Sequence, residues 1–352
     1  MDGLVERLNM YALSAMTLSA NSLTRTVLAA LSICLIAPVV IAQTLPETAG
    51  EWIERASDAR ERHSFVGSFI YQHGDDIETV RIWRAASAGQ GVRERLESLS
   101  GEYREILRDD ESITCILPNS DSRFIDDRRL RRTLSSRIPR DSSTLRPHYQ
   151  TDLGAQDRVA GRQAQHVRLV PRDKLRYGYD LWFDVQTGML VRAEVISPRG
   201  QVIERLMMLD FEPRQTIAKA ELRLSEPNEG FARVTTRTAL VDSAKPTLAN
   251  WVLNDIPAGF TLQMNQIEEL PGRPQPVRHL MYSDGLATVS IYIEAAGSAK
   301  TIEGVLQMGA MNAYGRAVGA HQAIVVGEVP TRTVERMAKA LVPLQSRDNS
   351  GN

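Results

Sequence analysis

The stretch RYGYDLWFD-VQTG-MLVRAEVIS-PRG-QVIERLMMLDF, residues 176–211, predicts three strands joined by two short turns. Every second side chain of the first strand is aromatic or aliphatic, so these side chains share one face: Tyr177, Tyr179, Leu181 and Phe183. The second strand alternates in the same way through Met189, Val191, Ala193 and Val195. The third strand is apolar on both faces near its end, which predicts deeper burial. Gly188 and Gly200 supply the positive φ of tight turns, so the stretch is predicted to form an antiparallel meander.

Similar patterns extend on both sides of this meander. Residues 47–62 predict a helix, because apolar side chains recur there every three or four positions. Short strands separated by turn residues are typical of an all-β sheet that curls. They are predicted at 65–72, 77–84, 92–99, 103–108, 112–117, 165–170, 217–224 and 231–240.

The chain is long enough for two domains, which we place at 43–240 and 250–345, with a linker at 241–249 and a tail at 346–352. In the second domain, HLMYSDGLATVSIYIE predicts a hairpin that turns at Ser283-Asp284-Gly285. Strands at 305–308 and 323–326 and a closing helix after Pro330 follow. The expected fold class is therefore α+β and rich in strands.

Residues 1–42 are expected to be a signal peptide. Arg25 precedes a short apolar run that Pro38 interrupts, and Val40 and Ala42 occupy the −3 and −1 positions of a cleavage site before residue 43. The run is too short for a membrane span. Translation could start at Met1 or at Met16, and both starts stay open.

The composition disfavours several classes of function. A net charge of −1 gives no general attraction to nucleic acid. The six histidines have no ligand spacing and are expected on surfaces or loops, so no metal or cofactor is predicted. Cys115, the thiol that remains after cleavage, is expected to be a buried apolar group. No GxSxG, P-loop, HExxH or GxGxxG pattern occurs in a suitable context, so the sequence does not predict an enzyme.

An arginine-rich segment, residues 119–146, interrupts the strands. It contains four closely spaced arginines, Arg128, Arg129, Arg131 and Arg132. They could belong to a solvated loop, or they could bind the anionic head group of a lipid, because guanidinium groups bind phosphate bidentately. The sequence leaves both alternatives open.

Several segments resemble the MucB/RseB family of periplasmic regulators of the sigma-E envelope-stress response. They are FVGSFIYQH at 65–73, ERLESLSGEYREILRDD at 94–110, RVAGR at 158–162, PRDKLRYGYDLWFDVQTGML at 171–190, IPAGF at 256–260 and YSDGLATVSIYIE at 282–294. The resemblance implies a half-open antiparallel β-barrel similar to the lipoprotein carriers, followed by a smaller α+β domain. It also implies a periplasmic, non-enzymatic protein that binds a membrane anti-sigma factor and protects it from proteolysis.

In this family, lipid or lipopolysaccharide is thought to oppose that binding. An apolar cavity for acyl chains could be lined by Phe69, Trp83, Tyr177, Tyr179, Trp182 and Phe183, although each of them could equally fill the core. The hairpin residues Tyr282, Asp284 and Gly285 are candidates for partner binding. A homo-oligomer is possible. The alternative function is a periplasmic carrier of lipid or lipoprotein, which would need only the first domain.

Overall fold

The computed structural model describes most of the chain from Leu45 onward: residues 45–87, 91–109, 112–118, 138–226, 229–237, 251–268, 275–296 and 303–344. The predicted signal peptide, the linker at 241–249, the tail and the four arginines at 128–132 lie outside these ranges. No helix in the described ranges has the length and apolarity of a membrane span. From Pro46 onward the chain forms one compact unit.

The first helix, α3 (Ala49–Arg62), begins at a complete capping box. The Thr48 side chain accepts from the backbone N–H of Glu51, and the Glu51 carboxylate accepts from the backbone N–H of Thr48. The apolar stripe predicted from the sequence is buried. The prediction of this helix is therefore confirmed, with a start two residues later than expected.

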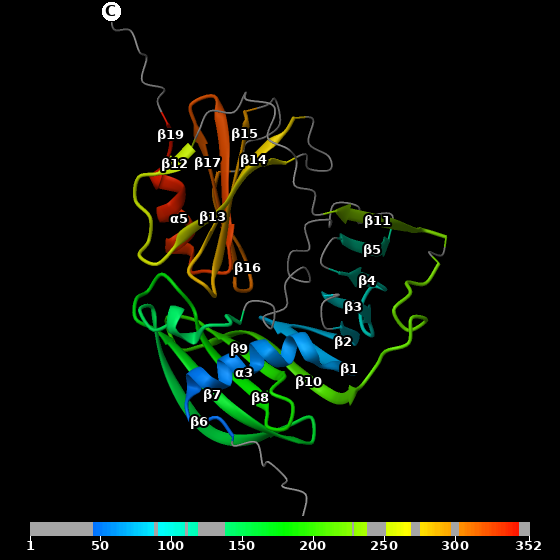
Figure 1. The fold of residues 1–352 in the computed structure, drawn as a ribbon. Coiled ribbons are helices and arrows are strands. Elements are labelled where there is room, and N and C mark those ends of the chain that lie inside the picture. The colour runs from blue at the N-terminus through cyan, green and yellow to red at the C-terminus, as the bar shows by residue number, and fades with distance from the viewer. Residues whose placement is uncertain are drawn as a thin grey trace, which may run out of the picture. The chain divides into compact units, whose positions relative to one another are not determined.

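An eleven-stranded antiparallel sheet follows, in the order β11-β5-β4-β3-β2-β1-β10-β9-β8-β7-β6 (Figure 1). Most neighbours are joined by hairpins, but β1 pairs with β10 and β5 pairs with β11. The strands are β1 (Ser64–His73), β2 (Asp76–Ser87), β3 (Gly91–Ser98), β4 (Glu105–Arg108), β5 (Ser112–Pro118), β6 (Tyr149–Val159), β7 (Arg162–Pro171), β8 (Gly178–Asp184), β9 (Leu190–Ile196), β10 (Val202–Arg214) and β11 (Phe231–Arg237).

The predicted meander is confirmed as β8, β9 and β10, with positive φ at Gly188 and Gly200. Two bulges correct its predicted faces. Val191 is an extra residue opposite the Trp182–Phe183 step, so Met189 and Val191 do not share a face with Ala193 and Val195. Leu209 is likewise extra opposite the Ser68–Phe69 step and is 49% exposed, so near its end the third strand is buried through Met208 and Phe211 but not on both faces.

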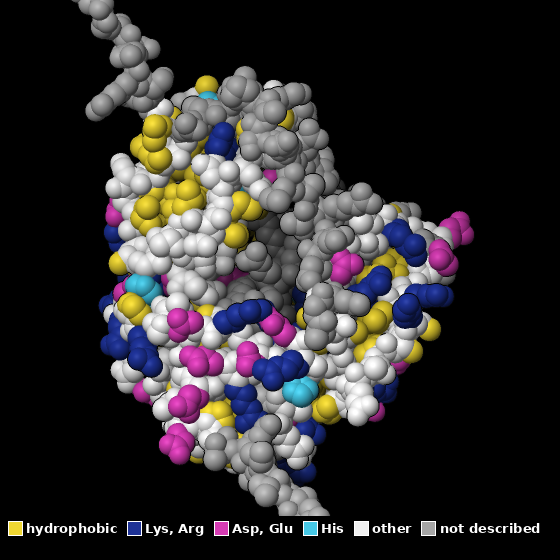
Figure 2. Space-filling model, viewed as in Figure 1, with side chains coloured by type: hydrophobic (Ala, Val, Ile, Leu, Met, Phe, Trp, Pro, Cys, Tyr) yellow, Lys and Arg dark blue, Asp and Glu magenta, His cyan; other side chains and the backbone are white. Residues whose placement is uncertain are grey.

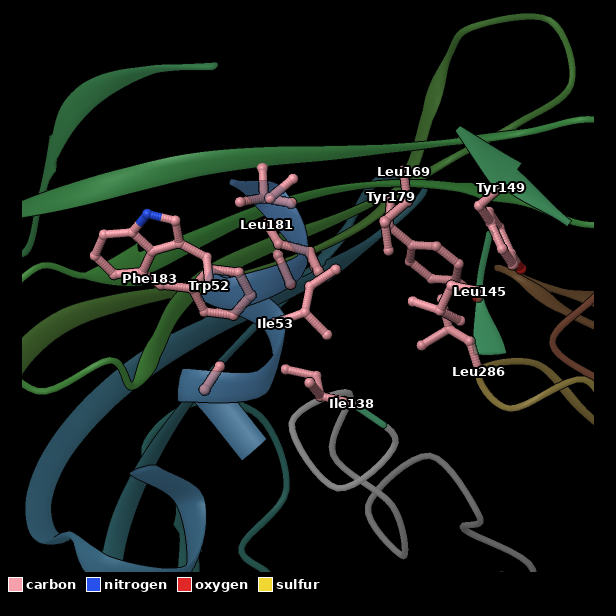
Figure 3. Close-up of a cluster of buried hydrophobic side chains, with 14 of the residues drawn as sticks. Trp52, Ile53, Ile138, Leu145, Tyr149, Leu169, Tyr179, Leu181, Phe183 and Leu286 are labelled. Carbon is pink, nitrogen blue, oxygen red and sulfur yellow. The ribbon is translucent and has the colours of Figure 1, made fainter. Parts of the chain in front are cut away.

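Most of the buried apolar side chains of α3 form one cluster with the sheet, and Ala59 joins a second cluster. Trp52 and Ile53 of α3 lie against Leu181 and Phe183 of β8, as Figure 3 shows. Full burial of a side chain as large as Trp52 contributes about 3 kcal/mol through area alone. On the surface shown in Figure 2, cationic and anionic side chains are interspersed, in keeping with the near-zero net charge.

The second half of the chain forms a six-stranded antiparallel sheet in the order β13-β14-β15-β18-β17-β16. The helix α5 (Thr331–Ala340) packs on one face through Val334, Met337 and Ala338. The strands are β13 (Thr261–Glu268), β14 (Val277–Ser283), β15 (Thr288–Ala295), β16 (Gly304–Met308), β17 (Met311–Val318) and β18 (His321–Gly327), with a separate pair formed by β12 (Trp251–Leu253) and β19 (Leu341–Pro343). The predicted hairpin is β14–β15, and the α+β, strand-rich fold class is confirmed.

Three smaller predictions were wrong. Residues 217–224 form turns and irregular backbone instead of a strand, with Ile217 and Leu222 buried against β1. Cys115 is only half-buried: it lies in β5, the second strand from the β11 edge, and packs at the border of an apolar cluster. His279 is buried in β14, where its ring bonds with Glu268 and Ser290.

Candidate functional site

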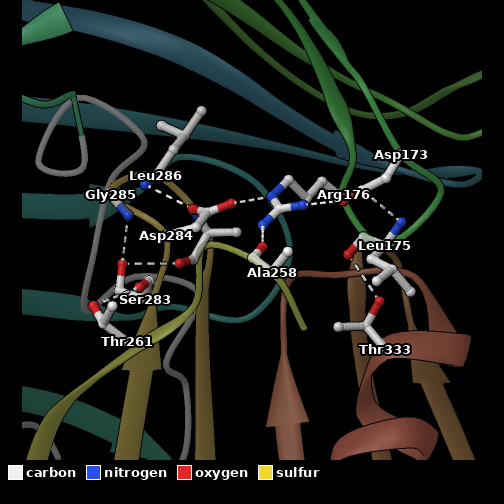
Figure 4. A network of polar contacts seen from close by, with 11 residues as sticks. Asp173, Leu175, Arg176, Ala258, Thr261, Ser283, Asp284, Gly285, Leu286 and Thr333 are labelled. Atoms are coloured by element: carbon white, nitrogen blue, oxygen red, sulfur yellow. Dashed lines mark hydrogen bonds and ion pairs between the residues drawn. The ribbon is translucent and has the colours of Figure 1, made fainter. Parts of the chain in front are cut away.

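A buried arginine joins the two sheets of the protein. Arg176 precedes β8 and is inaccessible to solvent, and its guanidinium pairs with Asp284 of the β14–β15 turn and with Asp173 (Figure 4). It also donates to the carbonyl of Ala258 and lies 5.0 Å from the ring centroid of Phe260. All its partners beyond Asp173 belong to the second half of the chain, so this residue holds the halves together.

Asp284 is fixed from its own side by the turn in which it lies. Its Oδ1 accepts from the backbone N–H of Leu286 at 3.0 Å and of Ala287 at 2.7 Å, while its Oδ2 faces Arg176. The turn needs Gly285, whose φ is +99°. Of the hairpin residues predicted to bind a partner, Asp284 and Tyr282 are buried within the chain itself, and only Gly285 is exposed. Their role in partner binding stays a prediction.

Further contacts extend the junction around Arg176. The Thr333 hydroxyl donates to the carbonyl of Leu175 at 2.8 Å, and the Asn312 amide donates to the Tyr177 hydroxyl at 2.9 Å. Burial raises the pKa of Tyr177 to about 12, so this hydroxyl stays protonated. Leu286 and Ala310 complete the apolar cluster beneath α3. A junction with this much buried contact is expected to act as a rigid connection.

The six aromatic candidates for a lipid cavity do not lie together. Tyr177, Tyr179 and Phe183 belong to the cluster beneath α3, whereas Phe69 and Trp182 belong to a second cluster along β1, β2 and β10. Trp83 lies in neither. It packs near Val66, Ile217 and Leu222, and the guanidinium groups of Arg95 and Arg81 lie 4.4 and 5.4 Å from its ring centroid. Five of the six side chains are at most 7% exposed, so in this structure these five are part of the apolar cores.

Buried carboxylates on β3 and β4 form a feature that the sequence analysis missed. Glu94 lies between Arg84 and Arg108, and Glu105 accepts from Arg95, from the Tyr103 hydroxyl at 2.8 Å and from the backbone N–H of Ser225 at 2.7 Å. Burial alone would raise the pKa of Glu94, but its two arginine partners outweigh this and lower it. The sequence did contain a signal for this feature: Glu94 lies opposite Arg84 and Arg108 in the neighbouring strands, so opposite charges occupy paired positions.

Asp180 and Asp184 of β8 are also buried carboxylates, and each one bonds with its own basic or hydroxyl partners. His166 at 2.8 Å and Arg168 at 2.7 Å bond with Asp180, and Arg162 donates to Asp184 at 2.7 Å while Thr187 donates at 2.7 Å. Burial raises the pKa of Asp184, but the bonds from Arg162 and Thr187 outweigh it, so the net shift is downward.

A depressed pKa in the folded state makes a stability contribution that exists above the unfolded pKa and is lost as the pH falls through the folded one. Replacing Asp184 by asparagine should therefore lower stability at neutral pH and flatten its decline between about pH 5 and pH 2. Urea denaturation of both proteins across this range would show it. Parallel curves of stability against pH would contradict the role given to Asp184.

The bonds of His279 resemble a hydrolytic triad, with Nε2 2.9 Å from Ser290 Oγ and Nδ1 2.8 Å from Glu268 Oε1. Ser290 lies in β15, which pairs on both sides with β14 and β18, so the ladders occupy its backbone N–H groups. The strand therefore provides no backbone donor for an oxyanion. No group of metal-ligating side chains occurs among the described residues.

The fold and this junction define a class: a strand-rich protein whose two large antiparallel sheets are joined through buried contacts. Profiles of the MucB/RseB N-terminal domain and the MucB/RseB C-terminal domain match residues 48–225 and 245–342. The chain belongs to the MucB/RseB family.

Proteins of known role and solved structures are similar to this one over most of the chain. The sigma factor AlgU regulatory protein MucB of Pseudomonas aeruginosa is 30% identical over 309 residues, which cover 87% of this chain and 94% of that protein. The sigma-E factor regulatory protein RseB of Salmonella typhimurium is 24% identical and covers 83% of this chain and 90% of its own. Among solved structures, MucB in the Pseudomonas aeruginosa MucA/MucB complex has a TM-score of 0.66 at 29% identity and covers 85% of this chain and 99% of its own. MucB in complex with MucA(peri) has a TM-score of 0.65 at 28% identity, covering 85% and 100%.

Proposed function

We propose that this protein binds the periplasmic part of a membrane-bound anti-sigma factor, shields it from regulated proteolysis and so restrains a sigma-E-type sigma factor. The observation that carries the proposal is the similarity to MucB in complexes with MucA, which extends over both domains. Family membership and the names of the relatives, all of them sigma-factor regulatory proteins, support it further.

The buried junction supports a binding function physically. A partner segment that spans both domains loses less free energy on binding if the two surfaces are already fixed relative to each other. The Arg176 contacts with Asp284 and Ala258 provide that fixation within the chain. The proposed compartment is the periplasm, reached through the signal peptide predicted at residues 1–42.

The response to lipid or lipopolysaccharide and the formation of a homo-oligomer stay predictions. The four candidate head-group arginines lie outside the described residues, and the six candidate aromatic residues are divided among three clusters. A carrier of lipid or lipoprotein, the alternative function, has no specific observation in its favour.

Binding can be tested directly by titrating the mature chain with the purified periplasmic fragment of the anti-sigma factor from the same organism. We expect a dissociation constant of about 1 μM or below, which corresponds to a binding free energy of about −8 kcal/mol or stronger. The bound fragment should resist the protease that cleaves it when free. The cytoplasmic fragment of the same anti-sigma factor is the control and should not bind. Equal cleavage rates with and without this chain would contradict the proposal. In a pull-down from envelope extract with the mature chain, recovery of lipoproteins without an anti-sigma factor would favour the carrier.

A further inference from the structure

The described strands include four edge strands: β6 and β11 in the larger sheet, and β13 and β16 in the smaller one. An edge strand presents unpaired N–H and C=O groups that can accept a strand from another chain. Proteins usually protect such edges with charged side chains or bulges. The four edges differ in this respect, and the difference indicates where a strand can be added.

Three of the edges carry such protection. The strand β6 has a bulge between Leu153 and Gln156 and several charged side chains. The strand β13 has a bulge between Leu262 and Met264 and ends at Glu268. Arg233 of β11 is charged and donates to the carbonyl of Ser225 at 3.0 Å.

The fourth edge, β16, has none of these features. Its sequence, GVLQM, contains no charge and no proline, and its register with β17 is uninterrupted. Val305, Leu306 and Met308 are 51%, 53% and 46% exposed. Within the described residues, no strand pairs with its outer side. Apolar side chains therefore stand on both faces of an edge that no described strand covers.

The turn after β16 determines which backbone groups face outward. Gly309 has a φ of +60° and opens a two-residue turn in which Met308 lies opposite Met311, the position at which a β-turn closes its hydrogen bond. Hydrogen-bonded and non-hydrogen-bonded pairs alternate in an antiparallel ladder. The N–H and C=O groups of Val305 and Gln307 consequently point away from β17, toward any added strand.

The charges at the two ends of β16 indicate what kind of strand fits. Exposed Glu303 precedes it, and at the other end Glu204 accepts from the N–H of Ala310 at 2.8 Å. In a second copy paired antiparallel about a two-fold axis, Glu303 of one copy would lie beside Glu204 of the other, and like charges across a sheet are destabilising. A segment with an apolar centre and basic ends would meet an apolar edge between two carboxylates.

We propose that the outer edge of β16 receives an extended segment of the anti-sigma factor as an added strand, with apolar residues at its centre and Lys or Arg at its ends. The proposal rests on the proposed function and specifies where the partner binds. The turn at Gly309 and Ala310 contacts Glu204 and the cluster beneath α3, so the added strand would run from the smaller sheet toward the larger one. That path engages both domains.

The decisive variant is Gln307→Pro, with Gln307→Ala as its matched control. Proline removes the outward N–H that the added strand would use, but it leaves the ladder to β17 intact, because edge strands tolerate proline at such positions. We expect Q307P to weaken binding of the periplasmic fragment by about tenfold, the effect of one lost hydrogen bond at the upper end of its range, and Q307A to change it little. Circular dichroism would verify that both variants melt like the natural protein.

A second pair of variants keeps the proposal testable if Q307P is less stable. Leu306→Lys places a charge on the edge without touching the core, and Leu209→Lys does the same at a site of similar exposure on β10. We expect only L306K to weaken binding. Unchanged affinity in L306K overturns the proposal, as does loss of self-association in sedimentation without loss of partner affinity. If the natural protein itself fails to bind the fragment, the proposed function fails first.

Discussion

Replacing Asp284 by alanine is expected to lower the free energy of unfolding by about 3–5 kcal/mol, because it leaves the guanidinium of Arg176 buried without its main partner in the second domain. The change also removes the acceptor for the N–H groups of Leu286 and Ala287. Unfolding in urea, followed by tryptophan fluorescence and by circular dichroism, would measure the loss. We also expect the two signals to separate, because the junction that couples the domains would be weakened.

The control is Asp255→Ala, an identical substitution in the same domain. Asp255 forms a bidentate pair with Arg336 at 2.6 and 2.7 Å, but both side chains are exposed, so its removal should have little effect. If D284A and D255A lost equal free energy of unfolding, the buried pair of Asp284 with Arg176 would contribute no more to stability than the exposed pair of Asp255 with Arg336. A D284A protein as stable as the natural one would refute the structural role of the junction.

Replacing Glu94 by glutamine is expected to have an effect of similar size, about 3–5 kcal/mol, because Arg84 and Arg108 would then face each other with no buried anion between them. The loss should be greatest near neutral pH. Because arginine bonds lower the pKa of Glu94 in the folded protein, its contribution exists above the unfolded pKa and disappears in acid as the carboxylate protonates. The stability of E94Q should thus approach that of the natural protein as the pH falls.

Glu97→Gln provides the matched comparison on the same strand. Glu97 bonds with Arg95 at 2.9 Å, but its side chain is 27% exposed and water can replace the contact. We expect E97Q to stay close to the natural protein at every pH. A difference between E94Q and the natural protein that does not narrow in acid would mean that the substitution acts through packing instead of charge.

The strands and turns that the sequence predicted share a local cause. Gly188 and Gly200 fix tight turns, and the alternating side chains around them have one core to face, so the meander follows from neighbouring residues. The bulges at Val191 and Leu209 could not be predicted in this way. A bulge depends on the partner strand, and nothing in the composition of β9 or β10 marks the extra residue.

The candidate site was less predictable, because its contacts join distant residues. The SDG turn of the hairpin was correctly predicted, but the partner of Asp284 is Arg176, 108 positions earlier. From the sequence alone, an aspartate at a turn is expected to cap the turn or to be exposed for binding. Only the three-dimensional structure shows that a distant arginine lies against it. The aromatic candidates failed to form one surface for the same reason: alternation places Tyr179 and Trp182 on opposite sides of β8, and only tertiary packing determines what each side meets.

The ladder between β1 and β10 has a consequence for how the chain is made. Ser64 pairs with Arg214 and His73 with Glu204, so the middle of the large sheet forms only between residues at least 131 positions apart in the sequence. A chain that emerges with its amino end first must keep the apolar strand FVGSFIYQ half-paired, with β2 on one side and nothing on the other, until β10 has followed. Pairings this distant in sequence form slowly, because loop closure precedes any gain from the contact. Until β10 has been synthesised and paired, the open edge of β1 is therefore the part of the chain most prone to aggregation.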